Sequence, residues 1–211
     1  MVRTQITRIP ELASQQRGDL DALLDSALVG HFALQADEHP VVIPTAIARD
    51  GDSVLAHGST GSRWMRALAS GVPTSLGVTM LDGIVVARSA FESSMHYRSA
   101  VLFGMCSTVV DPREKRAALD LITDRLLPGR VAEVRDPTVK ELAATLVLRL
   151  PIDQWSLKIS ADWPEDPDSD LAGPAWAGVV PMTVTYGAPH PAPDLSAGIE
   201  IPDSVRNLGR Y

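Results

Sequence analysis

Apolar positions in the first half of the chain follow two different periods. Leucine and alanine recur at helical spacing over residues 20–27, and Gly30 is expected to end that helix. Apolar runs of strand length follow, separated by short hydrophilic turns such as Asp50-Gly51-Asp52. Short turns favour antiparallel pairing, because parallel strands need a long crossover. The predicted strands are His31 to Ala36, Val41 to Ala48, Ser53 to His57 and Thr74 to Leu81.

The second half of the barrel region continues this pattern and adds helices between strands. Asp111 and Pro112 form a helix start with an N-cap and a proline at the first position. Thr138 to Glu141 has capping-box spacing for a shorter helix. Further strands are predicted at Ile84 to Phe91, Ser99 to Val110, Thr145 to Ile152 and Trp155 to Ser160. Many short strands and few helices predict a mainly β (α+β) fold, a closed antiparallel barrel with peripheral helices.

The C-terminal part of the chain differs from the rest in composition. Residues 161–211 hold half of the 16 prolines and show little periodicity. We therefore divide the chain into a barrel domain at 1–160 and an extended, proline-rich tail at 161–211. The tail is expected to pack on the barrel or on a partner subunit, with the apolar patch Ala175 to Pro181 docking.

Charge and composition narrow the classes of partner. The formal net charge is -7, which disfavours binding to nucleic acid or to an anionic membrane surface. No apolar run approaches the length of a membrane helix, and the N-terminus lacks the apolar core of a signal peptide, so a cytoplasmic protein is expected. The one cysteine, Cys106, lies in an apolar run and is interpreted as a buried structural thiol.

The segment from Gly58 to Arg63 is the first candidate for chemistry. A predicted strand enters a loop of glycine, serine and threonine, and a short helix follows, so backbone N–H groups, hydroxyls and the Arg63 guanidinium can form a phosphate cradle. The Gly-Lys-Ser/Thr ending of a nucleoside-triphosphate loop is absent. An ordinary turn with Ser62 as N-cap explains the same residues.

Histidines supply the second candidate. His57 ends a predicted strand next to this loop, where its imidazole can bond a ligand or act as an acid or base. A strand histidine with a satisfied hydrogen bond is the alternative. Residues 93–98, which include His96, Tyr97 and Arg98, are interpreted as a polar break between two strands. The five histidines show no metal-ligand spacing.

Four segments together carry a family resemblance. They are residues 41–47, 55–63 and 97–104, followed by the Asp111-Pro112 helix start. In this order they resemble the pyridoxamine 5'-phosphate oxidase-like flavin-binding proteins, nearest the nitroimidazole-resistance branch. The resemblance implies a six-stranded antiparallel split β-barrel with peripheral helices, and a homodimer with flavin mononucleotide (FMN) at the subunit interface.

The family's FMN contacts transfer to individual positions of this chain. Arg63 matches the phosphate-binding arginine, and Trp64 stands where lysine is common. A histidine at the position of His57 lies beside the flavin in the nitroimidazole-resistance branch, which makes His57 the candidate catalytic residue. The implied cofactor-binding residues are Pro44, Thr45, Ala46, His57, Gly58, Ser59, Thr60, Ser62, Arg63 and Ser99.

The resemblance leaves more than one function open. The first is an FMN-dependent oxidoreductase of a small-molecule substrate, in which the protein binds and tunes the flavin. The second is a non-catalytic carrier or sensor of flavin or haem, because fold does not fix function. A deazaflavin-dependent reductase ranks below these, since the anionic tail of that cofactor favours a more basic groove than this chain offers.

Overall fold

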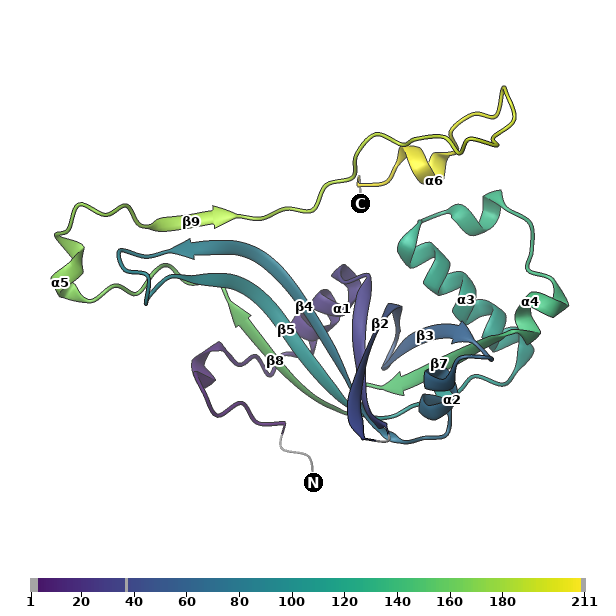
Figure 1. Cartoon of the computed structure of the whole chain (residues 1–211), viewed down its shortest axis with the longest axis horizontal. Coiled ribbons are helices and arrows are strands. Elements are labelled where there is room, and N and C mark those ends of the chain that lie inside the picture. Colours follow the sequence, from purple (N-terminus) through teal and green to yellow (C-terminus); the bar gives the residue numbers. More distant parts are fainter. Residues whose placement is uncertain (1–3, 37, 210–211) are drawn as a thin grey trace.

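A computed structural model describes residues 4–36 and 38–209 (Figure 1). Its described helices, the 3₁₀ segments included, are η1 (Pro10–Leu12), α1 (Arg17–Ser26), α2 (Arg63–Ala69), α3 (Pro112–Leu126), η2 (Arg130–Glu133), α4 (Val139–Ala143), α5 (Asp168–Leu171) and α6 (Asp203–Arg206). Its described strands are β1 (Val29–Ala36), β2 (His39–Asp50), β3 (Ser53–Ser59), β4 (Pro73–Val86), β5 (Ser94–Met105), β6 (Ser107–Thr108), β7 (Thr145–Pro151), β8 (Gln154–Ser160) and β9 (Gly178–Pro181).

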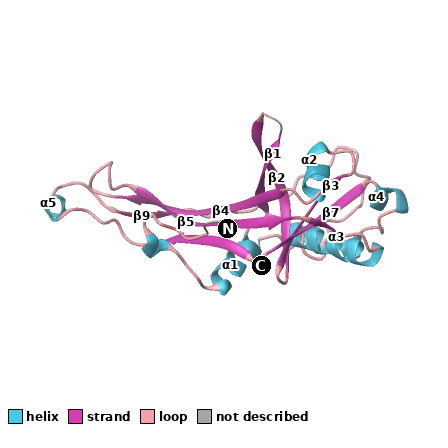
Figure 2. Ribbon diagram, turned by 90° about the horizontal axis from the view of Figure 1, so that it is seen from below, coloured by secondary structure: helices cyan, strands magenta, loops and turns pink. Residues whose placement is uncertain are grey.

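The strands form one antiparallel sheet that curls back on itself (Figure 2). Its order is β6-β7-β3-β2-β1-β4-β5-β8, with β9 added beside β4. Strand β6 follows β5 after the single residue Cys106 and pairs with β7, so the chain links the β7 side of the curled sheet directly to β5. The predicted mainly β split barrel is confirmed, although the described sheet has nine strands where six were expected.

The long β4–β5 hairpin differs from the prediction. The predicted strands Thr74 to Leu81 and Ile84 to Phe91 merge into one strand, β4, which has a bulge between Leu81 and Gly83 and ends at Val86, so Phe91 lies in the turn that follows. Asp82-Gly83 has turn composition, but the Asp82 carboxylate is held by Arg98 at 2.8 Å and the strand continues. The predicted polar break at 93–98 is likewise wrong, because His96, Tyr97 and Arg98 lie within β5. Tertiary pairing outweighs local turn composition here.

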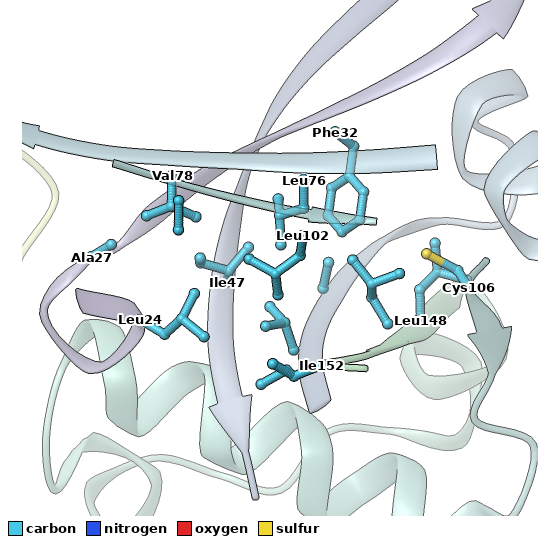
Figure 3. Close-up of a cluster of buried hydrophobic side chains, with 14 of the residues drawn as sticks. Leu24, Ala27, Phe32, Ile47, Leu76, Val78, Leu102, Cys106, Leu148 and Ile152 are labelled. Atoms are coloured by element: carbon cyan, nitrogen blue, oxygen red, sulfur yellow. The ribbon is translucent and has the colours of Figure 1, made fainter. Parts of the chain in front are cut away.

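The barrel interior holds most of the apolar core (Figure 3). Phe32, Leu76 and Leu102 come from three neighbouring strands and are almost completely buried. Helix α1 closes one side with its three buried leucines, at the helical spacing that the sequence predicted. A second cluster packs Ala118 and Ile122 of α3 against β2, β3 and β7.

Helix ends follow the capping signals in the sequence. The Asp111 side chain accepts from the backbone N–H groups of Arg113 and Glu114, and Thr138 and Glu141 form the predicted capping box. Gly30 does not end the first helix as predicted. It lies in β1, where an added Cβ would meet Leu76 Cδ1 at 2.6 Å. Within the described ranges, no helix is long and apolar enough to cross a bilayer.

Cys106 is buried between β5 and β6, as expected of a structural thiol. Its burial raises the pKa of the thiol to about 11, because the apolar surroundings disfavour the thiolate. The cysteine is therefore part of the core and unsuited to act as a nucleophile near neutral pH.

The tail packs first on the arm formed by β4 and β5. Asp166 has a fully buried side chain that accepts from the Arg88 backbone N–H at 2.6 Å and from Arg88 Nη1 at 2.8 Å. Strand β9 then pairs with Gly83–Val86 of β4, so Gly178–Pro181 of the predicted apolar patch dock there, whereas Trp176 is exposed. The final segment reaches α6, which lies beyond an exposed stretch of chain (Figure 1).

Candidate functional site

A cavity of about 190 Å³ opens where β2 and β3 meet the start of α2. Pro44 and Thr45 enter from β2, His57, Gly58 and Ser59 from the end of β3, and Ser62 from the cap of α2. The remaining wall is apolar: Phe32, Ile43, Ala56, Met65 and Leu68. A small set of polar groups on an apolar wall is the usual composition of a ligand site.

His57 is the titratable group of this cavity. Its Nδ1 atom is buried and has no hydrogen-bond partner among the described residues. Burial lowers the pKa of the imidazole, because the surroundings disfavour its charged form. His57 is therefore a neutral imidazole near pH 7, the form that ligates metals and exchanges hydrogen bonds with ligands. The alternative prediction, a strand histidine whose hydrogen bonds are satisfied, does not hold at Nδ1 of His57 among the described residues.

The loop after β3 is held largely by bonds within the protein. The N–H groups of Thr60, Gly61 and Ser62 donate to Ala144 O at 2.9 Å, Ser59 Oγ at 3.1 Å and Ser59 O at 3.0 Å. Ser62 caps α2 by accepting from Met65 N at 3.3 Å, as the turn interpretation predicted. These three N–H groups of the predicted cradle therefore already have acceptors within the protein.

Arginines flank the loop in two different ways. Arg66 Nη1 donates to the carbonyl oxygens of Thr60 and Gly61 at 3.0 and 2.9 Å, which ties the loop to α2. The Arg63 guanidinium lies 4.1 Å from the ring centroid of Trp64. Such cation–π stacking restrains an arginine without neutralising its charge. Trp64, at the position where lysine is common, thus orients the neighbouring cation.

The structure brings six of the ten predicted site residues to one cavity: Pro44, Thr45, His57, Gly58, Ser59 and Ser62. Ala46, Thr60, Arg63 and Ser99 do not line it. Ser99 lies on β5 with its Oγ 2.9 Å from Thr79 Oγ1, and it faces away from the buried neighbours Ala100 and Leu102.

Sequence reasoning missed the apolar wall of the cavity. Met65 reaches Gly58 so closely that a Cβ there would lie 2.8 Å from Met65 Cγ. Gly58 is therefore required by packing against α2 as much as by loop conformation. The helical spacing of Met65 and Leu68 indicates an inward face of α2, but the sequence does not say that this face borders His57.

A second surface of note is the outer face of the sheet. Alternate residues of β5 from Met95 to Phe103 point away from the core, together with their neighbours in register on β1, β2, β4 and β8. Large apolar side chains on this face and its extension along the arm are exposed: Val42, Leu81, Ile84, Met95 and Val180. Phe103 and Ala33 also border a hollow of about 500 Å³ on it.

Metal ligation by a cluster of side chains has no support in residues 4–36 and 38–209. No group of three or more histidine, cysteine, aspartate or glutamate side chains is placed there to hold an ion.

Comparison with known proteins gives matches of family and of fold. A family model described as pyridoxamine 5'-phosphate oxidase matches residues 16–159. The solved FAD and haem binding protein from Mycobacterium smegmatis is 54% identical to this chain. The match covers 93% of this chain and 97% of that protein's chain, with a TM-score of 0.90. The flavocytochrome Anf3 from Azotobacter vinelandii is 33% identical, and the match covers 97% of this chain and 95% of the flavocytochrome chain with a TM-score of 0.91.

A more distant structure shares the fold. A putative 5-nitroimidazole antibiotic resistance protein from Bacteroides thetaiotaomicron is 18% identical. The match covers 70% of this chain and 86% of that protein's chain, with a TM-score of 0.59. The curated proteins include no match.

Proposed function

This chain belongs to the pyridoxamine 5'-phosphate oxidase family, and on that premise we propose that it is a redox protein that binds both a flavin and a haem. The observation that carries the proposal is the 54% identity, over nearly the whole of both chains, to a protein described as binding FAD and haem. The flavocytochrome match over 97% of the chain supports the same pair of cofactors.

The flavin belongs beside the loop from Ser59 to Arg63. Ser59 and Ser62 supply hydroxyls at the cavity, and Arg63, the residue after Ser62, carries a positive charge and stacks on Trp64. FAD is the flavin favoured, since the relative with 54% identity is described as an FAD protein. FMN, which the sequence resemblance implied, stays a prediction. Chromatography of the extracted flavin distinguishes it from FAD.

His57 is the side chain best suited to the haem. Haem iron is commonly held by a neutral histidine and needs an apolar pocket around the macrocycle. His57 combines a desolvated imidazole with a wall that includes Phe32, Ile43 and Leu68. When bound, a haem supplies one-electron and O₂ chemistry, whereas a flavin supplies hydride transfer. The residues of this cavity orient the cofactors, exclude water and keep the imidazole unprotonated.

The cavity of one protomer is small for either cofactor. Its volume of about 190 Å³ is smaller than the roughly 300–1,000 Å³ of typical cofactor pockets. The outer face exposes large apolar side chains, among them Val42, Ile84 and Met95, and exposed apolar surface of this kind is typical of protein–protein interfaces. A homodimer formed through that face buries it, and it brings groups such as Ser99 of a second copy to a shared site.

The absorption spectrum of purified or reconstituted protein tests the proposal. Paired near-ultraviolet and blue bands together with a sharp Soret band are expected, and chromatography of the extract identifies FAD or FMN. Absence of the Soret band after reconstitution contradicts haem binding, and absence of the paired bands contradicts flavin binding. Reduction of the bound cofactors by a nicotinamide in multiple turnovers separates an oxidoreductase of small molecules from a carrier or sensor. A cytoplasmic location stays a prediction.

Arg63→Ala is expected to weaken flavin binding by about 1.5–3 kcal/mol, or roughly 10- to 150-fold, because a charged hydrogen bond to phosphate is lost. Fluorescence titration with FAD and FMN measures the loss. Riboflavin has no phosphate, so its affinity is expected to change little.

A matched control is Arg8→Ala, which removes the same charge from an exposed position of the N-terminal segment. Equal losses for FMN and riboflavin contradict the assignment of Arg63 to the phosphate.

A further inference from the structure

Residues 182–201, here called the C-terminal strap, connect β9 to the segment that carries α6. Every residue of the strap is exposed. Its large apolar side chains are exposed as well: Met182, Val184, Tyr186, Leu195, Ile199 and Ile201. In Figure 1 the strap runs from β9 to α6 apart from the barrel strands. Tyr186, Pro189 and Ile201 border a hollow together with α6, whereas Val184 and Ile199 stand apart from it and are exposed in the described part of the chain.

Hydrogen bonds within the protomer hold both ends of the strap. At the first end, Met182 N donates to Asp82 O at 3.0 Å, directly after β9 pairs with β4. At the second end, Ser204 donates to Glu133 of η2 from its N–H at 3.0 Å and from its hydroxyl at 2.5 Å. These bonds also lower the pKa of Glu133, since they favour its carboxylate. The strap therefore has a defined path.

The strap has little of its own to hold that path. Ser204 is the only buried residue among positions 182–209. Ordering a backbone residue costs about 1–2 kcal/mol, which an extended segment without a core does not recover internally. Prolines at 181, 189, 191, 193 and 202 reduce that cost by limiting the backbone. A stiff, pre-extended, apolar segment is suited to lie along another surface.

The chemistry of the strap points to an apolar protein surface. Its charged side chains are Asp194 and Glu200, both negative, so nucleic acid and anionic lipid are poor partners. The strap also continues directly from β9, whose Val180 is paired with Ile84 and lies on the exposed outer face of the arm. That outer face is the surface assigned above to the homodimer, so the strap is continuous with it.

We propose that the strap of each protomer packs against a second copy of the chain and clasps the homodimer. This inference rests on the dimer of the proposed function. A two-fold axis makes the exchange reciprocal, so each chain gives one strap and receives one. The partner surface then buries Val184 and Ile199, which are 89% and 58% exposed in the single chain.

The first test is the dissociation constant of the dimer, measured by analytical ultracentrifugation on full-length variants. Val184→Ser with Ile199→Ser is expected to raise it by about tenfold or more, because two apolar contacts are lost. Both residues are exposed in the protomer, so its fold and its circular dichroism are expected to stay the same. The matched control is Val139→Ser in α4, where valine is 85% exposed and outside the strap.

The second test is photo-crosslinking with benzoylphenylalanine in place of Val184. Irradiation is expected to give a product of two chains, whereas the same probe at Val139 gives single chains. A dimer whose dissociation constant stays within twofold in the double variant, or a probe that yields only single chains, overturns the strap assignment. A wild-type chain that is monomeric at micromolar concentration overturns the proposed dimer as well, whatever cofactors it binds, so the two failures are distinguishable.

Discussion

His57→Ala is expected to lower haem affinity by roughly 100-fold or more and to leave the secondary structure unchanged. Removing even a group that only orients a metal ligand costs about 10- to 100-fold, so loss of the ligand itself lies at or above that range. His57 is the one histidine that the structure places in the apolar cavity. Haem titration followed at the Soret band measures the effect, and far-ultraviolet circular dichroism reports the fold.

The flavin gives this variant a second readout. If the imidazole lies beside the ring, His57→Ala shifts the flavin spectrum or potential but lowers flavin affinity less than Arg63→Ala does. His39→Ala is the control, because His39 is exposed at the start of β2. A variant that binds haem normally, keeps the wild-type flavin spectrum and loses thermal stability would show that His57 has a structural role.

The pH dependence follows from the lowered pKa of His57. Burial holds this pKa below the ordinary value of 6.5, so the folded chain binds a proton at His57 less readily than the unfolded chain. Stability from the neutral imidazole is fully present above pH 6.5 and is lost as the pH falls through the folded pKa. NMR titration of the ring protons in the apo-protein is therefore expected to place its midpoint below 6.5. A midpoint above 6.5 would contradict the desolvated environment.

Phe32→Ala is expected to destabilise the protein by about 3–5 kcal/mol, because it removes a large buried side chain and leaves a cavity. Phe32 is 1% exposed and belongs to the barrel core (Figure 3). It also lines the cavity that contains His57. Urea unfolding followed by tryptophan fluorescence at a fixed protein concentration measures the change.

The control for this substitution is Val110→Ala. Val110 is 82% exposed between β6 and α3, so its replacement is expected to alter stability by no more than about 0.5 kcal/mol. A loss below about 1 kcal/mol for Phe32→Ala would mean that the barrel interior collapses around the site or that Phe32 is not packed.

Local signals in the sequence determined the elements of this protein. Leucines at helical spacing gave α1, Asp111 and Thr138 marked the starts of α3 and α4, and alternating runs with short turns indicated an antiparallel β fold. These features depend on residues near one another in the chain, so a single sequence is enough to read them. The family also followed from ordered motifs, and with it the position of His57 beside a loop.

Other features depended on contacts between distant residues, which only the tertiary structure decides. Asp82-Gly83 has the composition of a turn, yet pairing with β5 and the bond from Arg98 make it a bulge in a long strand. Gly30 has the composition of a helix stop, yet it serves the close approach of Leu76 in the core.

The same holds for the site and the tail. The sequence placed Ser62 and His57 near each other, but the apolar wall of Met65 and Leu68 and the unpartnered Nδ1 atom exist only where α2 folds against β3. Proline content indicated an extended tail, whereas its two anchor points on β4 and Glu133 are far apart in sequence. Local preference determined the helix starts and the antiparallel β class of this chain, and long-range packing determined the course of β4 and β5, which residues share a cavity and which face is exposed.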